Sequence, residues 1–290
     1  FGAWVRDCFE CSYPRNAIWY IQDVTVTEPF ILLDQDTRGV ATITLNRPEF
    51  HNAFNDLVIR ELTQTLETVA ANPNVRVLLL RSEGKSFSAG ADLNWMKAAI
   101  NNSRKENEQD AARLAGLFHR LDTMPMPTIA RVQGSAFAGG LGLVVCCDVS
   151  IGVKHAKFSV TEVKLGLIPA VISPYLSAAI GPSEARRFFH TAELFDAEDA
   201  WRIGILHEAV DDEELDATVE GVIQSILGNA PEANSACKSL IRKLSSRVDD
   251  EIRIDTGRRI AAIRATDEAQ EGISAFFEKR SPNWIVEDEA

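Results

Sequence analysis

Along the first two thirds of the chain, segments with the hydrophobic spacing of strands alternate with segments that have the spacing of helices. Val40–Leu45 alternates and is rich in β-branched residues, which predicts a strand, whereas the apolar positions of Asp56–Ala71 are mostly spaced as on one face of a helix. Three more apolar runs predict buried strands, at Val75–Leu80, Ile129–Val132 and Val149–Val153. Because strands that alternate with helices build parallel sheets covered on both faces, we predict an α/β core with a mostly parallel sheet.

After about residue 170 the pattern becomes helical. Helical spacing runs through five segments: Ser183–Thr191, Ala197–Ile203, Glu213–Leu227, Pro231–Leu244 and Glu251–Arg264. No low-complexity linker and no internal repeat interrupts the chain. We therefore predict a core over residues 26–200 and a helical C-terminal region over residues 201–290, packed on that core or on a neighbouring subunit. Residues 1–25 have neither periodicity nor the features of a signal peptide, so we treat them as an extension outside the fold.

Charge and cysteine usage narrow the class of protein. A net charge of −12 argues against a nucleic-acid surface, and no apolar run is long enough to span a bilayer. The five cysteines form no regular framework, which is typical of a reducing compartment, and we expect a cytoplasmic location. Cys8 and Cys11 form a C-x-x-C pair with neither a second pair for zinc nor a βαβ context for redox chemistry, and Cys146 and Cys147 lie in a core-like apolar run.

Two glycine-bearing turns carry the candidate chemistry. Residues 87–96 and residues 134–143 each follow an apolar strand and open a helix-like run. The first N–H groups of a helix have no partner within it, so two such turns that meet can hold a developing oxyanion. Either turn by itself also suits a plain strand-to-helix connection, with Asp92 as an anion in the first turn of the helix. The two turns in this order are the stronger signal.

Further motifs surround the two turns in a defined order. They are Leu45-Asn46-Arg47-Pro48 with His51-Asn52-Ala53, Phe87-Ser88-Ala89-Gly90-Ala91-Asp92-Leu93, Ala138-Gly139-Gly140, Glu162-Val163-Lys164-Leu165-Gly166-Leu167-Ile168-Pro169 and the tail Glu271–Arg280. Together they resemble the enoyl-CoA hydratase/isomerase, or crotonase, family from about Ile31 to Trp284. The resemblance implies a ββα spiral core, a helical C-terminal trimerisation region and a homotrimer or homohexamer. It also implies an acyl-CoA thioester substrate, whose coenzyme A is part of the substrate, so that neither a separate cofactor nor a metal is expected.

The resemblance implies a role for each matching position of the two turns. The backbone N–H groups of Ala91 and Gly139 correspond to the oxyanion hole of the family, which polarises the thioester carbonyl. The implied substrate contacts are Ala91, Asp92, Leu93, Asn94, Gly139 and Gly142. Lys97, Arg47 and Lys279 are candidates for binding the CoA nucleotide, and solvated surface charges are the alternative for each of them. Trp95 and Met96 either shape an acyl pocket or pack their helix.

Glu162 falls where the family carries its general acid/base glutamate. It precedes the apolar run Leu165–Ile168, and a carboxyl group in a partly apolar setting has a raised pKa that suits proton transfer near neutral pH. The alternative is a carboxylate that merely caps a helix. Most hydratases of the family carry a second glutamate at the position of Gly142, and here that carboxylate is missing. His119 or Asp122 could assist in holding the water, although a surface or capping role is the simpler interpretation of each.

Three functions remain open from the sequence. Asn94-Trp95-Met96 and Ala170–Tyr175 resemble the branch that hydrates branched glutaconyl-CoA thioesters of leucine or acyclic-terpene breakdown, such as methylglutaconyl-CoA and isohexenylglutaconyl-CoA. The leading hypothesis is therefore hydration of such a 2-enoyl-CoA. The single glutamate also suits Δ3-Δ2 enoyl-CoA isomerisation. A non-catalytic binding protein with this fold is the alternative of another class.

Overall fold

The structure is a computed structural model that describes residues 29–99, 102–244 and 267–285. The predicted extension over residues 1–25, with Cys8 and Cys11, lies outside the described residues. So does the predicted helix Glu251–Arg264.

The larger sheet contains every strand predicted from the sequence. Its order is β1-β2-β3-β5-β7-β10, and all neighbours are parallel except the edge strand β1 with β2. The strands are β1 (Ile31–Gln35), β2 (Val40–Leu45), β3 (Val77–Ser82), β5 (Thr128–Val132), β7 (Val149–Val153) and β10 (Glu208–Val210). Because β10 lies after residue 200, the sheet extends beyond the predicted core segment, residues 26–200. The boundary between core and C-terminal region at residue 200 stays a prediction.

A smaller second sheet is formed by short strands, of which β4, β6 and β8 each follow a strand of the larger sheet. Its order is β4-β6-β8-β9, with β4, β6 and β8 parallel and β9 antiparallel. Its strands are β4 (Ser86–Ser88), β6 (Ser135–Phe137), β8 (Lys157–Ser159) and β9 (Phe195–Asp196). The pairs β3–β4, β5–β6 and β7–β8 are each followed by helical structure, so the chain repeats a strand–strand–helix unit. This is the ββα arrangement expected from the sequence.

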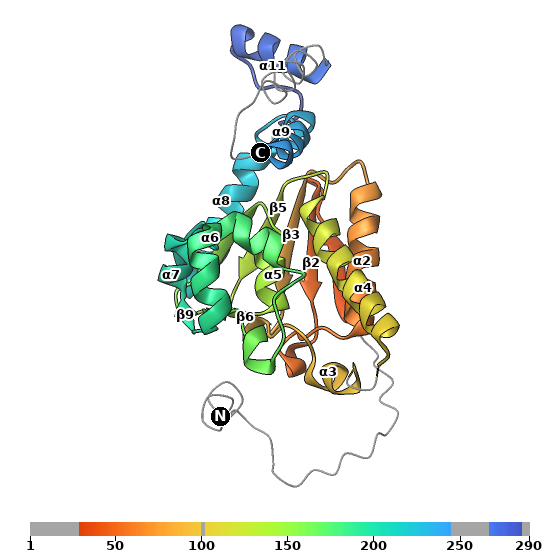
Figure 1. The fold of residues 1–290 in the computed structure, drawn as a ribbon. Helices are drawn as coiled ribbons and strands as arrows, with labels where there is room; N and C mark the ends of the chain where they lie inside the picture. Colours follow the sequence, from red (N-terminus) through yellow and green to blue (C-terminus); the bar gives the residue numbers. More distant parts are fainter. Residues whose placement is uncertain (1–28, 100–101, 245–266, 286–290) are drawn as a thin grey trace.

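Helices cover both faces of the larger sheet. The short 3₁₀-helix η1 (Pro48–Phe50) precedes α2 (Asp56–Ala71), which packs beside α4 (Arg104–Asp122), with α3 (Leu93–Ala99) at the end of this pair (Figure 1). The inward side of α2 consists of Val58, Ile59, Leu62, Leu66 and Val69. The last four have the predicted helical spacing, whereas Leu57, which that spacing also included, is 42% exposed. The remaining helical elements before residue 200 are α5 (Gly139–Val145), η2 (Glu162–Leu165), α6 (Ser173–Thr191) and α7 (Ala197–Arg202).

Helix α6 begins ten residues before the predicted start. It runs from Ser173, and its backbone is interrupted at Gly181, where φ is 72° and ψ is 164°. Pro182 follows, and glycine tolerates this positive φ without a steric penalty. Two helical stretches thus meet at a kink at Gly181, and the helix predicted over Ser183–Thr191 corresponds to the second of them.

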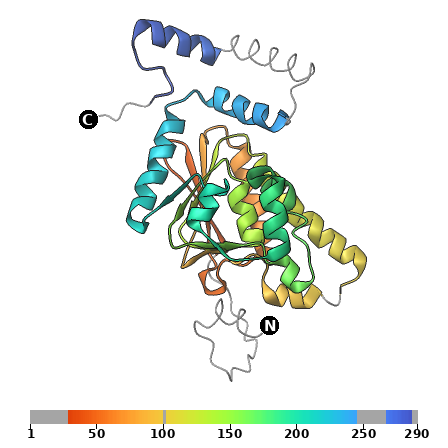
Figure 2. The ribbon, with the colours of Figure 1, turned by 60° about the vertical axis from the view of Figure 1, so that its left-hand side comes forward.

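The C-terminal region is helical, as predicted. After η3 (Asp212–Glu214) come α8 (Leu215–Leu227), α9 (Pro231–Lys243) and α11 (Asp267–Glu278). Figures 1 and 2 show α9 and α11 beyond one end of the sheets and α3 at the opposite end. Within the described part of the chain, no helix combines the length and the apolar character needed to cross a membrane.

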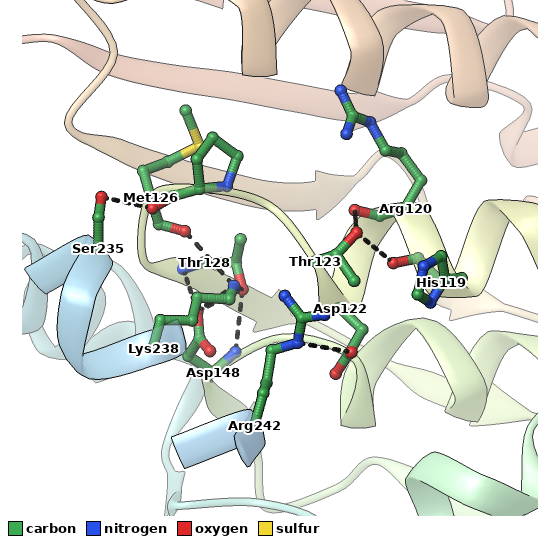
Figure 3. A network of polar contacts seen from close by, with 11 residues as sticks. His119, Arg120, Asp122, Thr123, Met126, Thr128, Asp148, Ser235, Lys238 and Arg242 are labelled. Carbon is green, nitrogen blue, oxygen red and sulfur yellow. Dashed lines mark hydrogen bonds and ion pairs between the residues drawn. The ribbon is translucent and has the colours of Figure 1, made fainter. Parts of the chain in front are cut away.

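Helix α9 is attached to the core through a network of polar contacts (Figure 3). Lys238 is 8% exposed, and its Nζ lies 2.6 Å from Asp148 Oδ2. The same carboxylate oxygen accepts hydrogen bonds from the backbone N–H and the hydroxyl of Thr128, at 2.8 and 2.9 Å. Ser235 donates to the carbonyl of Pro125 at 2.6 Å. Cys146 and Cys147 are buried nearby as core residues, as predicted.

Removal of the buried Lys238 ammonium is expected to lower stability. Lys238→Met leaves the partly buried Asp148 carboxylate without its counter-charge, and we expect a loss of about 2–3 kcal/mol of unfolding free energy. Adding Asp148→Asn should recover most of that loss, because neither charge is then left unpaired. Urea unfolding measures both changes. Lys243→Met, at an exposed position of the same helix, is the control, and an equal effect of the two lysine variants would contradict the prediction.

Candidate active site

Three predicted catalytic groups lie at one edge of the smaller sheet. Ala91 follows the end of β4, Gly139 follows β6 and Glu162 follows β8. These three strands are parallel neighbours in the order β4-β6-β8. Because the carboxyl ends of parallel strands meet at the same edge, the topology gathers segments that are widely separated in the sequence.

The N–H group of Ala91 is left unpaired by a short parallel bridge to Phe54. Phe54 donates its N–H to the carbonyl of Gly90 at 2.7 Å, and its carbonyl accepts from the N–H of Asp92 at 2.8 Å. In a parallel bridge of this kind the central residue directs its own N–H to the other side. No described residue accepts a hydrogen bond from Ala91 N–H. It is therefore available to a ligand.

Gly139 offers a second N–H group beside the first. The preceding residue, Ala138, has φ 48° and ψ −119°, a conformation that costs a non-glycine residue energy. It turns the chain from β6 into α5, and within the described residues the N–H of Gly139 has no acceptor. The turns touch: a Cβ added to Gly90 would lie 3.2 Å from the nitrogen of Gly139. The two predicted donors thus stand on adjacent backbone segments.

Glu162 opens the 3₁₀-helix η2 and carries a buried carboxyl oxygen. Its Oε2 has no hydrogen-bond partner among the described residues. Burial raises the pKa of this carboxyl above its ordinary value, only partly offset by a hydrogen bond from its own backbone N–H. The direction agrees with the expectation. The expected cause does not hold in full, because Leu165, Leu167 and Ile168 are 59%, 50% and 73% exposed and do not belong to the buried core.

The space beside Gly142 is filled by apolar side chains. A Cβ at this position would lie 2.4 Å from Cγ2 of Ile172 and 2.9 Å from Cε1 of Phe118. Both residues are buried, and Phe118 also packs toward Tyr175, with 6.5 Å between the ring centroids. The second carboxylate is therefore absent, and the volume that it would need is occupied.

Residues of the first turn help to line a cavity of about 390 Å³. It is lined by Arg47, Phe50, Asn55, Asp56, Leu57, Asp92, Asn94 and Trp95. Two predicted substrate contacts, Asp92 and Asn94, are in this lining, and Leu93 next to them is 58% exposed. Glu162, Gly139 and Gly142 are not part of it. The cavity thus lies beside the segment that follows Ala91.

The charged candidates separate into buried and exposed groups. Arg47 is 8% exposed and pairs with Asp92 at 2.7 Å, so its guanidinium is bound within the protein. Lys97 and Lys279 are exposed, as solvated charges or as nucleotide contacts would be. Asp122 Oδ2 lies 3.7 Å from Arg242 Nε, and His119 is exposed. A role for any of them in binding substrate or water stays a prediction.

Sequence reasoning missed Phe54 and Ile172. Phe54 contacts both donor segments, because its backbone pairs with Gly90 and Asp92 while its ring would lie 2.9 Å from a Cβ at Gly139. Its place directly after the His51-Asn52-Ala53 motif was the available signal. No local signal identified Ile172, since its contact with Gly142 joins two elements 30 residues apart.

Comparisons with known proteins show which family the chain is similar to. The family model for enoyl-CoA hydratase/isomerase matches residues 35–287. The crotonyl-CoA hydratase of Syntrophomonas wolfei is 32% identical over 88% of this chain and 97% of its own length. An enoyl-CoA hydratase structure from Shewanella pealeana has a TM-score of 0.85 and 45% identity, over 88% of this chain and 96% of its own. One from Mycobacterium smegmatis has a TM-score of 0.84 and 34% identity, over 89% of this chain and 99% of its own.

These matches confirm the expected crotonase-type fold and enzyme class. The family model extends over nearly the whole described chain, and its range includes both turns and Glu162. The chain belongs to the enoyl-CoA hydratase/isomerase family.

Proposed function

We propose that this protein adds water to the double bond of a 2-enoyl-CoA. The observation that carries the proposal is the unpartnered, buried Oε2 of Glu162 at the sheet edge that also presents the free N–H groups of Ala91 and Gly139. The two N–H groups polarise the thioester oxygen and hold the negative charge that reaches it in the enolate. The names of relatives such as the crotonyl-CoA hydratase of Syntrophomonas wolfei support this reaction.

Glu162 moves one proton from water to carbon in this scheme. Its carboxylate accepts a proton from water while the water oxygen bonds to C3, and the π electrons pass to the thioester oxygen. The carboxyl then returns that proton to C2 as the enolate collapses, which leaves the enzyme unchanged. Burial raises the pKa of Glu162, which makes its carboxylate a stronger base and favours the first transfer, from water to Glu162.

For the substrate we propose a branched glutaconyl-CoA, on the sequence match at Asn94-Trp95-Met96 and Ala170–Tyr175. For the assembly we propose a homotrimer or a homohexamer, in which the helical C-terminal region contacts neighbouring subunits. Light scattering or sedimentation of the full chain tests the assembly.

A panel of acyl-CoA thioesters with product identification tests the reaction. Crotonyl-CoA, methylglutaconyl-CoA, isohexenylglutaconyl-CoA and a 3-enoyl-CoA are incubated separately with pure enzyme, and products are separated by liquid chromatography against standards and identified by mass spectrometry. The expected result is a product 18 mass units heavier from a 2-enoyl-CoA, with methylglutaconyl-CoA or isohexenylglutaconyl-CoA preferred over crotonyl-CoA. If none of the three 2-enoyl-CoA thioesters is hydrated, the proposal is contradicted.

Δ3-Δ2 isomerisation is the second candidate, favoured by the surroundings of Gly142. Ile172 and Phe118 fill the space of a second carboxylate, and one base suffices to move a proton between two carbons. In the panel it predicts a 2-enoyl product of unchanged mass from the 3-enoyl-CoA. A non-catalytic binding protein predicts no turnover of any thioester, and the presence of Glu162 at the same sheet edge as both donors argues against it.

A further inference from the structure

A second buried ion pair lies directly beside the proposed oxyanion hole. Arg47 Nη1 is 2.7 Å from Asp92 Oδ2, and the two side chains are only 10% and 6% exposed. The Arg47 guanidinium also lies over the ring of Phe50, 4.1 Å from its centroid. A pair this buried has to be well hydrogen-bonded, since both charges have lost most of their hydration.

Each oxygen of the Asp92 carboxylate has its own partners. Oδ2 accepts from Arg47, while Oδ1 accepts from the backbone N–H groups of Asn94 at 2.7 Å and Trp95 at 3.2 Å. Burial by itself would raise the pKa of Asp92, but the bond to Arg47 and these two N–H bonds bring the pKa below its ordinary value. Asp92 is therefore an ionised group that holds the residues after Ala91 in place.

Arg47 also binds the segment Ala53–Phe54, which pairs with the backbone on either side of Ala91. The same Nη1 that pairs with Asp92 donates to the carbonyl of Ala53 at 3.0 Å. Ala53 is followed by Phe54, whose N–H and carbonyl bond to the residues on either side of Ala91 at 2.7 and 2.8 Å. One guanidinium nitrogen thus joins the two segments whose pairing directs the Ala91 N–H.

We propose that Arg47 and Asp92 are positioning residues that hold the Ala91 N–H in line with the thioester oxygen. The inference rests on the proposed oxyanion hole. It gives Arg47 a role different from the nucleotide contact considered from the sequence, because its charge is used inside the protein. A backbone donor is useful in catalysis only if it is preorganised, and displacement by an ångström costs a large part of its effect.

The test compares variants of this pair with variants of the other buried pair. Arg47→Met removes the cation, and Asp92→Asn keeps shape and capping oxygen while it removes the charge. We expect each to lower kcat at least tenfold on the preferred thioester, with KM changed less than threefold. Lys238→Met breaks another ion pair, Lys238–Asp148, whose lysine is buried and whose carboxylate is partly exposed, at the end of the sheets where α9 packs. It should lower stability while kcat stays within twofold.

An infrared measurement separates positioning from a merely structural role. Butyryl-CoA with a ¹³C thioester carbonyl has no double bond to react, and its carbonyl band should move to lower frequency when it binds to the unaltered enzyme. In the Arg47→Met and Asp92→Asn variants the band should lie closer to its frequency in water. If Arg47→Met does not fold, the measurement is made on Asp92→Asn, whose side chain has nearly the same shape as that of the aspartate.

The outcomes distinguish this inference from the proposed function. An unshifted carbonyl band in the unaltered enzyme would contradict the oxyanion hole itself. A shift in the unaltered enzyme that persists fully in folded Asp92→Asn, with kcat within twofold, would overturn the positioning role and leave the oxyanion hole intact.

Discussion

Glu162→Gln is expected to lower kcat by about 10²–10⁴-fold with little change in KM, because it removes the group that transfers the proton. Glutamine retains the shape of the side chain, so the acyl-CoA should still bind between the two donors. Steady-state kinetics on the preferred thioester of the panel measures the change. Glu198→Gln, at an exposed position in the first turn of α7, is the control and should leave kcat unchanged. A Glu162→Gln variant with more than a tenth of the original kcat would exclude Glu162 as the acid/base group.

The same variant should be more stable than the unaltered protein at alkaline pH. Burial raises the pKa of Glu162 above 4.5, so the folded state binds this proton more tightly than the unfolded state does. The contribution of Glu162 to stability is therefore fully present below about pH 4.5 and is lost as the pH rises through the raised folded pKa. Thermal unfolding at pH 5 and pH 8 should show a stability gain in Glu162→Gln that is larger at pH 8. A loss of stability at pH 8 would contradict this.

Gly142→Glu should destabilise the protein by about 3 kcal/mol or more, because it overpacks the core and buries a charge that has no described partner. Its Cβ alone would lie 2.4 Å from Ile172 Cγ2 and 2.9 Å from Phe118 Cε1. Chemical denaturation measures the loss. Adding Ile172→Ala removes the nearest obstacle and should recover part of it.

Alanine scanning of two helical glycines separates packing from helix propensity. Glycine to alanine in an open helix stabilises by about 0.5–1 kcal/mol, and we expect this gain at Gly221 in α8, where a Cβ meets nothing within 4 Å. At Gly142 the same change should destabilise by about 1–3 kcal/mol because Ile172 and Phe118 have to move. Equal effects on stability at both positions would contradict this, because they would show that Ile172 and Phe118 can move away from Gly142 at little cost.

These predictions depend on a fold whose elements were mostly predictable. The strand Val40–Leu45 and the helix Asp56–Ala71 appear with the predicted bounds, because their apolar positions have the clear periods of 2 and 3.6 residues. Helix α6 was predicted only in part, since Gly181 and Pro182 separate its two helical stretches and the first of them, which begins at Ser173, was not predicted. Strand β10 has only three residues and owes its place to pairing with β7, which no local pattern reveals.

The sequence by itself determined the family and which groups to propose for the chemistry. Ala91, Gly139 and Glu162 stand in motifs whose order is specific, so their roles could be proposed before any coordinates. Backbone donors need glycine and alanine turns, and such turns are visible in the residue types. Gly142 likewise showed that the second carboxylate is missing.

Only the tertiary structure decided how these groups are held and what surrounds them. It brings the two turns into contact through parallel pairing of β4 with β6, and it places Phe54 between them. It also pairs Arg47 with Asp92, 45 residues away, and packs Ile172 into the space beside Gly142. The physical reason is that contacts between distant segments depend on how strands and helices pack together, and periodicity within a single element carries no record of its neighbours.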